Sequence, residues 1–271
     1  MSSSLMLSIV IYVYGFAFIF YISSAIFSKK ELLKVGTILS YTALLGNSTG
    51  FLLRWYESYQ KGVGHIPLSN LYESLVFFAL VISALYLYLE ARHKKYIISM
   101  ICSFFCILCM AWASFKTVDT IRPLLPALKS NWLTIHVLTC FLGYSGFAVA
   151  FGLSILLLTK NNLPERVVKF TEAEIDALTH QMISFGFLFL TLGIVTGAVW
   201  ANSAWGSYWT WDPKETWSLI TWFVYLIFLH LRFMKGWHGK KLAIISIIGF
   251  LAVMFTYFGV NYLPGLHSYG A

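Results

Sequence analysis

The chain has 271 residues, of which 59% are hydrophobic and only 11% are charged, and its formal net charge is +8. This composition excludes a soluble globular domain, because the charges gather between nearly uncharged runs of about 20 residues, the length that crosses ~30 Å of hydrocarbon. The basic excess does not indicate a nucleic-acid-binding protein, since no soluble domain is left to carry a basic face.

Apolar runs follow one another along the whole chain, and each predicts a transmembrane helix. They lie near residues 5–27, 35–55, 71–91, 96–115, 132–159, 182–201, 217–232 and 242–263. We therefore predict an all-α, polytopic integral membrane protein with about eight spans, which forms a single membrane domain over residues 1–271. The first run has no preceding basic residue and no obvious small-residue cleavage site, so we expect a retained helix rather than a signal peptide.

The connections between the spans predict the orientation. Lys and Arg favour the cytoplasmic side, and most of them gather in alternate connections, which places those connections inside and both termini outside. The inside connection at 160–181 is predicted to hold a short helix on the membrane surface, because apolar residues recur there at about helical spacing among charges. These residues are Val167, Phe170, Ile175 and Leu178.

The sixth span contains Gly193 and Gly197 in a G-x-x-x-G pattern, which is typical of close helix packing. Four cysteines, Cys102, Cys106, Cys109 and Cys140, fall within spans four and five. Buried cysteine behaves as a small apolar residue, so we expect these thiols to pack rather than to react.

The outer connection between spans six and seven reads WGSYWTWDPKETW over residues 205–217. One interpretation is an interfacial belt, since Trp and Tyr favour the headgroup region. The density of rings equally favours a platform for an apolar, planar ligand, to which each ring would add about 0.5–1.5 kcal/mol beyond its area burial. Residue chemistry alone leaves both interpretations open.

The candidate ligand-binding residues of this outer loop, 200–217, are Trp205, Gly206, Tyr208, Trp209, Trp211, Asp212 and Trp217. We expect Asp212 and Glu215 to organise the loop by hydrogen bonding to its backbone.

Histidines favour the platform. His136 lies near the outer end of the fifth span, about 6 Å of helix rise from it, and His267 follows the eighth span in PGLHSYGA. A lone histidine is more often a structural residue, but two imidazoles at the depth of the aromatic loop would suit a haem held edge-on, with axial nitrogens above and below the iron. His230 lies about 20 Å inward from Trp217, so it would bind iron only at a second site.

At these residues the sequence resembles the CcsA/ResC family of haem-handling membrane proteins, part of the System II cytochrome c synthase. WGSYWTWDPKETW matches the tryptophan-rich WWD signature of this family. The match extends over nearly the whole chain, through GHIPLSNLYES (64–74), LKSNWLTIHV (128–137), GAVWANSAWG (197–206), LITWFVYLIFLH (219–230) and GLHSYG (265–270). The ending DPKETW resembles this branch rather than the related CcmC and CcmF proteins.

The resemblance implies that His136 and His267 are the outer axial ligands and that the WWD segment holds the porphyrin. It assigns His230 to a site nearer the cytoplasm, whose companion imidazole comes from a membrane partner of the CcsB/ResB type. It also implies a haem-attachment activity: haem b is carried to the outer face, where its vinyl groups are joined to the C-x-x-C-H thiols of an apocytochrome c. The alternatives are a haem exporter or chaperone without ligation, and a structural or quinone-type subunit without haem. The expected membrane is the bacterial inner membrane, with the chloroplast thylakoid as the alternative.

Three further outer residues have weaker expectations. His65 is expected to have a loop role, because Pro67 and Asn70 follow it. Glu73 is expected to cap or pair at the start of the third span. Arg54 is an expected outer cation that could offset haem propionates or contact lipid headgroups.

Overall fold

The structure is a computed structural model that describes residues 2–116, 119–164 and 170–265. Within these ranges the chain is helical and has no strand. The long helices are α1 (Ser3–Phe27), α2 (Lys30–Gln60), α3 (Leu71–His93), α4 (Ile97–Lys116), α5 (Asn131–Thr159), α6 (Glu172–Trp205), α7 (Pro213–Lys235) and α8 (Lys240–Tyr257). Every predicted span coincides with one of them, which confirms the all-α, polytopic membrane fold. Which side of the membrane holds the termini stays a prediction.

The chain folds into two compact helical units. Unit 1 comprises Met1–Pro126 with Asn162–Lys169, and therefore α1 to α4; unit 2 comprises Ala127–Asn161 with Phe170–Ala271, and therefore α5 to α8. That the two units act as one membrane domain stays a prediction.

Helix α2 is built differently from the others. Seven helices among the described residues are long and apolar enough to cross a membrane, and α2 is not among them. Its buried face consists of small and polar residues: Gly36, Ser40, Ala43, Asn47, Gly50, Arg54 and Ser58. Apolar residues such as Ile38, Leu45 and Leu52 are exposed instead. The helix therefore presents its apolar side outward and its polar side to α1 and α3. The polar residues on that buried side lower its mean hydropathy below that of the other helices.

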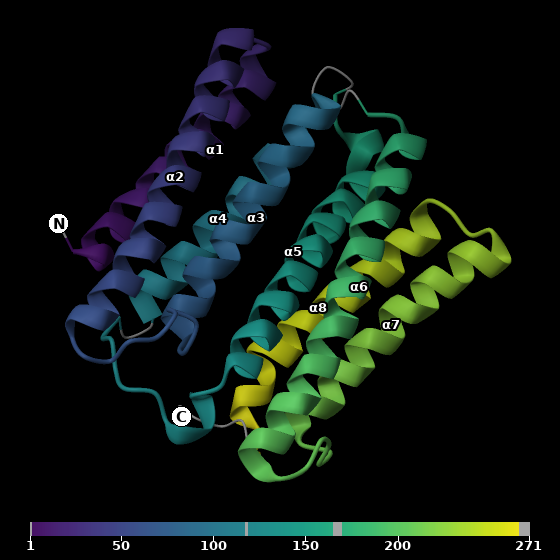
Figure 1. Ribbon diagram of the computed structural model, residues 1–271. Coiled ribbons are helices and arrows are strands. Elements are labelled where there is room, and N and C mark those ends of the chain that lie inside the picture. The colour runs from purple at the N-terminus through teal and green to yellow at the C-terminus, as the bar shows by residue number, and fades with distance from the viewer. Residues whose placement is uncertain (1, 117–118, 165–169, 266–271) are drawn as a thin grey trace. The chain divides into compact units, whose positions relative to one another are not determined.

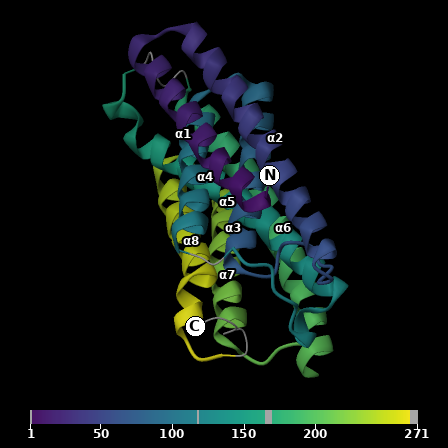
Figure 2. The same ribbon diagram turned by 90° about the vertical axis from the view of Figure 1, so that its left-hand side faces the viewer.

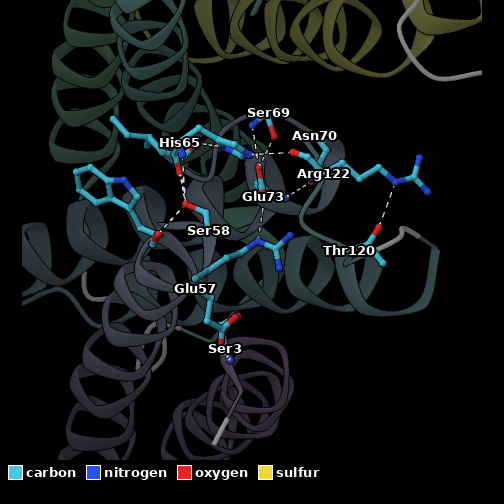
Figure 3. A network of polar contacts seen from close by, with 12 residues as sticks. Ser3, Glu57, Ser58, His65, Ser69, Asn70, Glu73, Thr120 and Arg122 are labelled. Carbon is cyan, nitrogen blue, oxygen red and sulfur yellow. Dashed lines mark hydrogen bonds and ion pairs between the residues drawn. The ribbon is translucent and has the colours of Figure 1, made fainter. Parts of the chain in front are cut away.

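A buried ion pair joins α2 to α3 in unit 1 (Figure 3). Arg54 Nε donates to Glu73 Oε1 at 2.9 Å, and the two side chains are only 2% and 1% exposed. Glu73 Oε2 also accepts hydrogen bonds from the backbone and hydroxyl of Ser69, at 2.9 and 2.8 Å. The expected pairing of Glu73 is confirmed. The expectation that Arg54 offsets haem propionates or contacts lipid headgroups is wrong, because its side chain is buried and paired with Glu73.

His65 fixes the loop between α2 and α3 (Figure 3). Its Nδ1 lies 2.9 Å from the carbonyl oxygen of Ile66, and its Nε2 lies 3.2 Å from that of Arg122. The residue is buried, and its backbone also bonds with Ser58 of α2. These contacts confirm the expected loop role.

In unit 2, α5 and α6 pack closely side by side, and α8 lies along both α5 and α7 (Figures 1 and 2). Glycines permit this approach: a Cβ on Gly143 would lie 3.0 Å from the carbonyl oxygen of Gly186. The rings of Phe147 and Tyr225 stack 3.6 Å apart and tie α5 to α7. The four cysteines, on α4 of unit 1 and α5 of unit 2, form no disulfide. Three are buried and Cys109 is partly buried, which confirms their expected packing role.

Helix α6 begins well before the predicted sixth span. Thr171 and Glu174 form a capping box at its start, and the helix then continues without a break to Trp205. The short helix predicted at 160–181 is wrong in its bounds: residues 172–181 are the first turns of α6, because no Gly or Pro interrupts residues 172–182 and the cap at Thr171 starts a helix that continues to Trp205. Its place at the membrane surface stays a prediction. Val167 lies outside the described residues.

Candidate functional site

The aromatic connection is a short turn that is capped at both ends. Gly206 ends α6 in the left-handed conformation, with φ of 76°, and its N–H donates to Asn202. Asp212 begins α7, where its Oδ1 accepts the N–H of Lys214 at 2.9 Å. Glu215 reaches back to accept the N–H groups of Thr210 at 2.7 Å and of Asp212 at 3.3 Å. The expectation that Asp212 and Glu215 organise this loop is confirmed.

The rings of the loop divide into exposed and supporting ones. Tyr208 and Trp211 are 58% and 68% exposed. Trp209 meets Trp211 edge-on, with ring centroids 5.7 Å apart. Trp211 also has a φ of 61°, unusual for a residue with a side chain. The two capping carboxylates therefore hold a turn whose backbone presents an aromatic side chain outward.

Other rings tie this turn to the helices. Trp205 packs edge-on against Trp200 of α6 at 4.8 Å, and Trp217 of α7 lies 4.1 Å from the ring of Phe255 in α8. Trp209 carries a buried indole N–H that has no acceptor among the described residues. An orphaned donor below exposed rings fits a ligand that brings an oxygen to the loop.

His136 lies on α5 at the same end of unit 2 as the aromatic turn. Its Nδ1 is 2.7 Å from the carbonyl oxygen of Gly193 in α6. Its ring is nearly parallel to that of Trp200, with an interplanar angle of 14° and centroids 6.2 Å apart. The structure thus brings the predicted ligand His136 beside Trp200, which in turn contacts Trp205 of the predicted loop.

The other two predicted ligands are placed differently. His230 lies on α7 near its C-terminal end and is exposed, in a row with Phe223, Ile227 and Phe233 on the outer surface of that helix. It is far along α7 from the aromatic turn, as predicted. His267 lies outside the described residues, so its pairing with His136 stays a prediction. Among the described residues no three His, Cys, Asp or Glu side chains gather as a ready metal site.

Sequence reasoning missed the contacts beneath His136. A Cβ on Gly197 would lie 2.6 Å from His136 Nδ1, and the thiol of Cys140 lies 3.7 Å from the same nitrogen. The signal in the sequence was the G-x-x-x-G pattern of Gly193 and Gly197, about two to three turns before Trp205, which predicts close helix packing but does not show which side chain packs there. A haem fits the groups at this end of unit 2: the imidazole of His136, the exposed rings of Tyr208 and Trp211, and the orphaned indole N–H of Trp209.

Known proteins resemble this chain along most of its length. The family described as Cytochrome C assembly protein matches residues 68–267. A cytochrome c biogenesis protein CcsA of Chlamydomonas reinhardtii is 48% identical over 230 residues, which are 81% of this chain and 64% of that protein. A CcsA of Prochlorococcus marinus is 38% identical over 272 residues, 87% of this chain and 84% of the relative.

Among solved structures, a cytochrome c heme lyase CcmF superimposes with a TM-score of 0.71 at 17% identity, covering 96% of this chain and 50% of the other. At this identity the likeness shows a common fold. The chain spans about two thirds or less of the algal protein and of CcmF, 64% and 50% respectively. Because the family matches most of the chain and two CcsA proteins are 48% and 38% identical to it, the chain belongs to the cytochrome c assembly protein family, in the branch of the CcsA proteins.

Proposed function

We propose that this protein acts in cytochrome c biogenesis as the haem-attachment component of a cytochrome c synthase. It takes haem b from the cytoplasmic side and presents it at the outer face to the C-x-x-C-H thiols of an apocytochrome c. The observation that carries the proposal is the position of His136. Its Nδ1 is hydrogen-bonded to a backbone carbonyl at 2.7 Å, beside the ring-rich turn, and both lie within the residues that the family matches.

In this proposal the histidines and the aromatic loop have different roles. His136 and His267 bind the iron axially, and the loop residues of 205–217 hold the porphyrin by ring contact. When bound, haem supplies the vinyl groups, across which each cysteine S–H adds, so that the proton ends on a vinyl carbon and no oxidant is consumed. Three of the chain's four cysteines are buried and the fourth, Cys109, is partly buried on α4 in unit 1, so we assign the reacting thiols to the apocytochrome.

The outer ligands are tested by His136→Ala and His267→Ala, each co-expressed with a CcsB/ResB-type partner and an apocytochrome reporter. We expect loss of holocytochrome in both variants and partial recovery when imidazole fills the vacated axial position. His93→Ala, at the end of α3 in unit 1, is the control for histidine removal. Normal maturation in both single variants would refute the assignment.

The inner site is assigned to His230, with its second imidazole supplied by the partner. Its exposure on the outer surface of α7 supports this, because an imidazole facing lipid is costly unless a partner or ligand meets it. His230→Ala should lower the haem that copurifies with the complex, whereas His136→Ala should leave haem trapped but unattached. Full haem content in the His230→Ala complex would remove the inner site from the mechanism.

A haem exporter without ligation activity is the alternative function. Both functions give bound haem, so the apocytochrome reporter distinguishes them: haem export without thioether formation by the purified complex would favour the exporter. For location we propose the bacterial cytoplasmic membrane, with the thylakoid as the alternative. Fractionation of the source cells decides between the two membranes.

A further inference from the structure

One face of α6 forms a seat for the ring of His136. Gly193, Gly197 and Trp200 are spaced by four and three residues, so they lie on the same side of the helix. The imidazole lies against all three. Its Nδ1 lies 2.7 Å from the carbonyl oxygen of Gly193, the ring fills the space that a Cβ on Gly197 would need, and its plane is within 14° of the Trp200 ring.

The carbonyl of Gly193 determines which nitrogen of His136 carries the proton. A carbonyl oxygen only accepts hydrogen bonds, so His136 Nδ1 must donate across the 2.7 Å contact. In the neutral imidazole the lone pair is then on Nε2. Histidines that bind metals commonly donate the other ring N–H to a carbonyl or carboxylate, which fixes the ring and raises its basicity as a ligand.

The two glycines are needed for different reasons. At Gly197 a Cβ would lie 2.6 Å from Nδ1 and 2.8 Å from Cε1 of His136, so a methyl group there would take the place of the ring itself. At Gly193 a Cβ would instead lie 2.6 Å from the thiol sulfur of Cys140. That sulfur is 3.7 and 4.0 Å from the two ring nitrogens of His136, so Cys140 supports the ring from one turn further along α5.

We propose that Gly193 and Gly197 are positioning residues for haem binding: they hold the His136 imidazole in the tautomer and plane that direct Nε2 to the iron. The G-x-x-x-G pattern then has a role beyond packing α5 against α6. This inference rests on the proposed function, because it requires His136 to be an iron ligand.

The decisive test uses imidazole rescue in the His136→Ala background. Free imidazole must occupy the same seat as the lost side chain, so Gly197→Ala should weaken the rescue. We expect the imidazole concentration for half-maximal holocytochrome to rise about 10- to 100-fold in His136→Ala/Gly197→Ala, the usual effect of losing an outer partner of a metal ligand. In the full-length chain with His136 intact, Gly197→Ala should lower haem attachment and shift the bound haem from the low-spin to the high-spin absorbance spectrum.

Gly186→Ala is the matched control. Its methyl group would enter the same α5 and α6 interface, 2.6 Å from the ring of Phe147, where no imidazole lies. In the His136→Ala background it should leave the half-maximal imidazole concentration unchanged, even if the amount of protein in the membrane falls. Equal weakening of rescue by Gly186→Ala and Gly197→Ala would overturn the proposal, because it would show that both act through helix packing.

A second pair of variants tests the seat if Gly197→Ala fails to accumulate. Gly193→Ala keeps the carbonyl but crowds the thiol, so Cys140→Ala in the same chain should restore haem attachment, whereas Cys140→Ala should not restore Gly197→Ala. Failure of Cys140→Ala to restore Gly193→Ala would overturn the inference. The proposed function fails separately: it is refuted when His136→Ala alone matures cytochrome normally, whatever the glycine variants do.

Discussion

The cap of α7 gives a sharp prediction, because two changes at Asp212 separate its hydrogen bond from its charge: Asn keeps the acceptor and loses the charge, whereas Ala loses both. Asp212 is nearly buried, and its carboxylate accepts the N–H of Lys214 at 2.9 Å. Removing an N-cap side chain costs about 0.5–2 kcal/mol, which corresponds to a loss of about 2- to 30-fold in the ordered population of the turn. We therefore expect Asp212→Ala to lower holocytochrome formation within that range, since the rings of the turn lose their fixed positions.

Asn caps helices about as well as Asp. Asp212→Asn keeps the acceptor and loses only the attraction of a negative charge to the helix N-terminus, about 0.3–1 kcal/mol. Its activity should fall by only about 2- to 5-fold, between the wild type and Asp212→Ala. The assay is holocytochrome yield by haem stain, normalised to the amount of chain in the membrane. Glu215→Gln and Glu215→Ala should follow the same order, because Glu215 accepts from Thr210 and Asp212.

The reasoning is refuted if Asp212→Asn is as damaging as Asp212→Ala. That result would show that the negative charge itself is required, for example against the haem iron or the substrate, and that the hydrogen bond to the helix start is secondary.

Two further predictions concern the rings and the buried ion pair. Phe at Trp209 or Trp211 should mature more cytochrome than Ala at the same position, because a ring is kept; equal defects from Phe and Ala at both positions would argue against ring contact. Glu73→Ala should leave the guanidinium of Arg54 buried without its partner and destabilise the protein by about 3–5 kcal/mol. Thermal unfolding in detergent should show the largest loss for this single variant and a smaller one for Glu73→Ala/Arg54→Met, and an unchanged midpoint in Glu73→Ala would contradict the buried pair.

The sequence alone determined the all-α membrane class and the approximate bounds of the long helices, whereas the number of spans, predicted as about eight, stays a prediction because α2 is not apolar enough to count among the seven candidate spans of the described residues. Crossing a membrane needs a run of apolar residues of a certain length, and this is a local property that can be read along the chain. The capped turn was also predictable from Asp212, Pro213 and Glu215, because capping is a contact between residues close in sequence. The extent of α6 was predicted less well, since charges at 172–176 suggested a surface segment although nothing there ends a helix.

Which side of each helix meets which neighbour was decided only by the tertiary structure. Lipid is about as apolar as a leucine side chain, so the periodicity that separates buried from exposed faces in water is weak in a membrane helix. The sequence therefore could not show that Arg54 is enclosed against Glu73, or that α2 buries its polar face. It also could not show that Gly193 and Gly197 meet His136, because the rotation of α6 against α5 brings together residues far apart in sequence, 57 positions for His136 and Gly193.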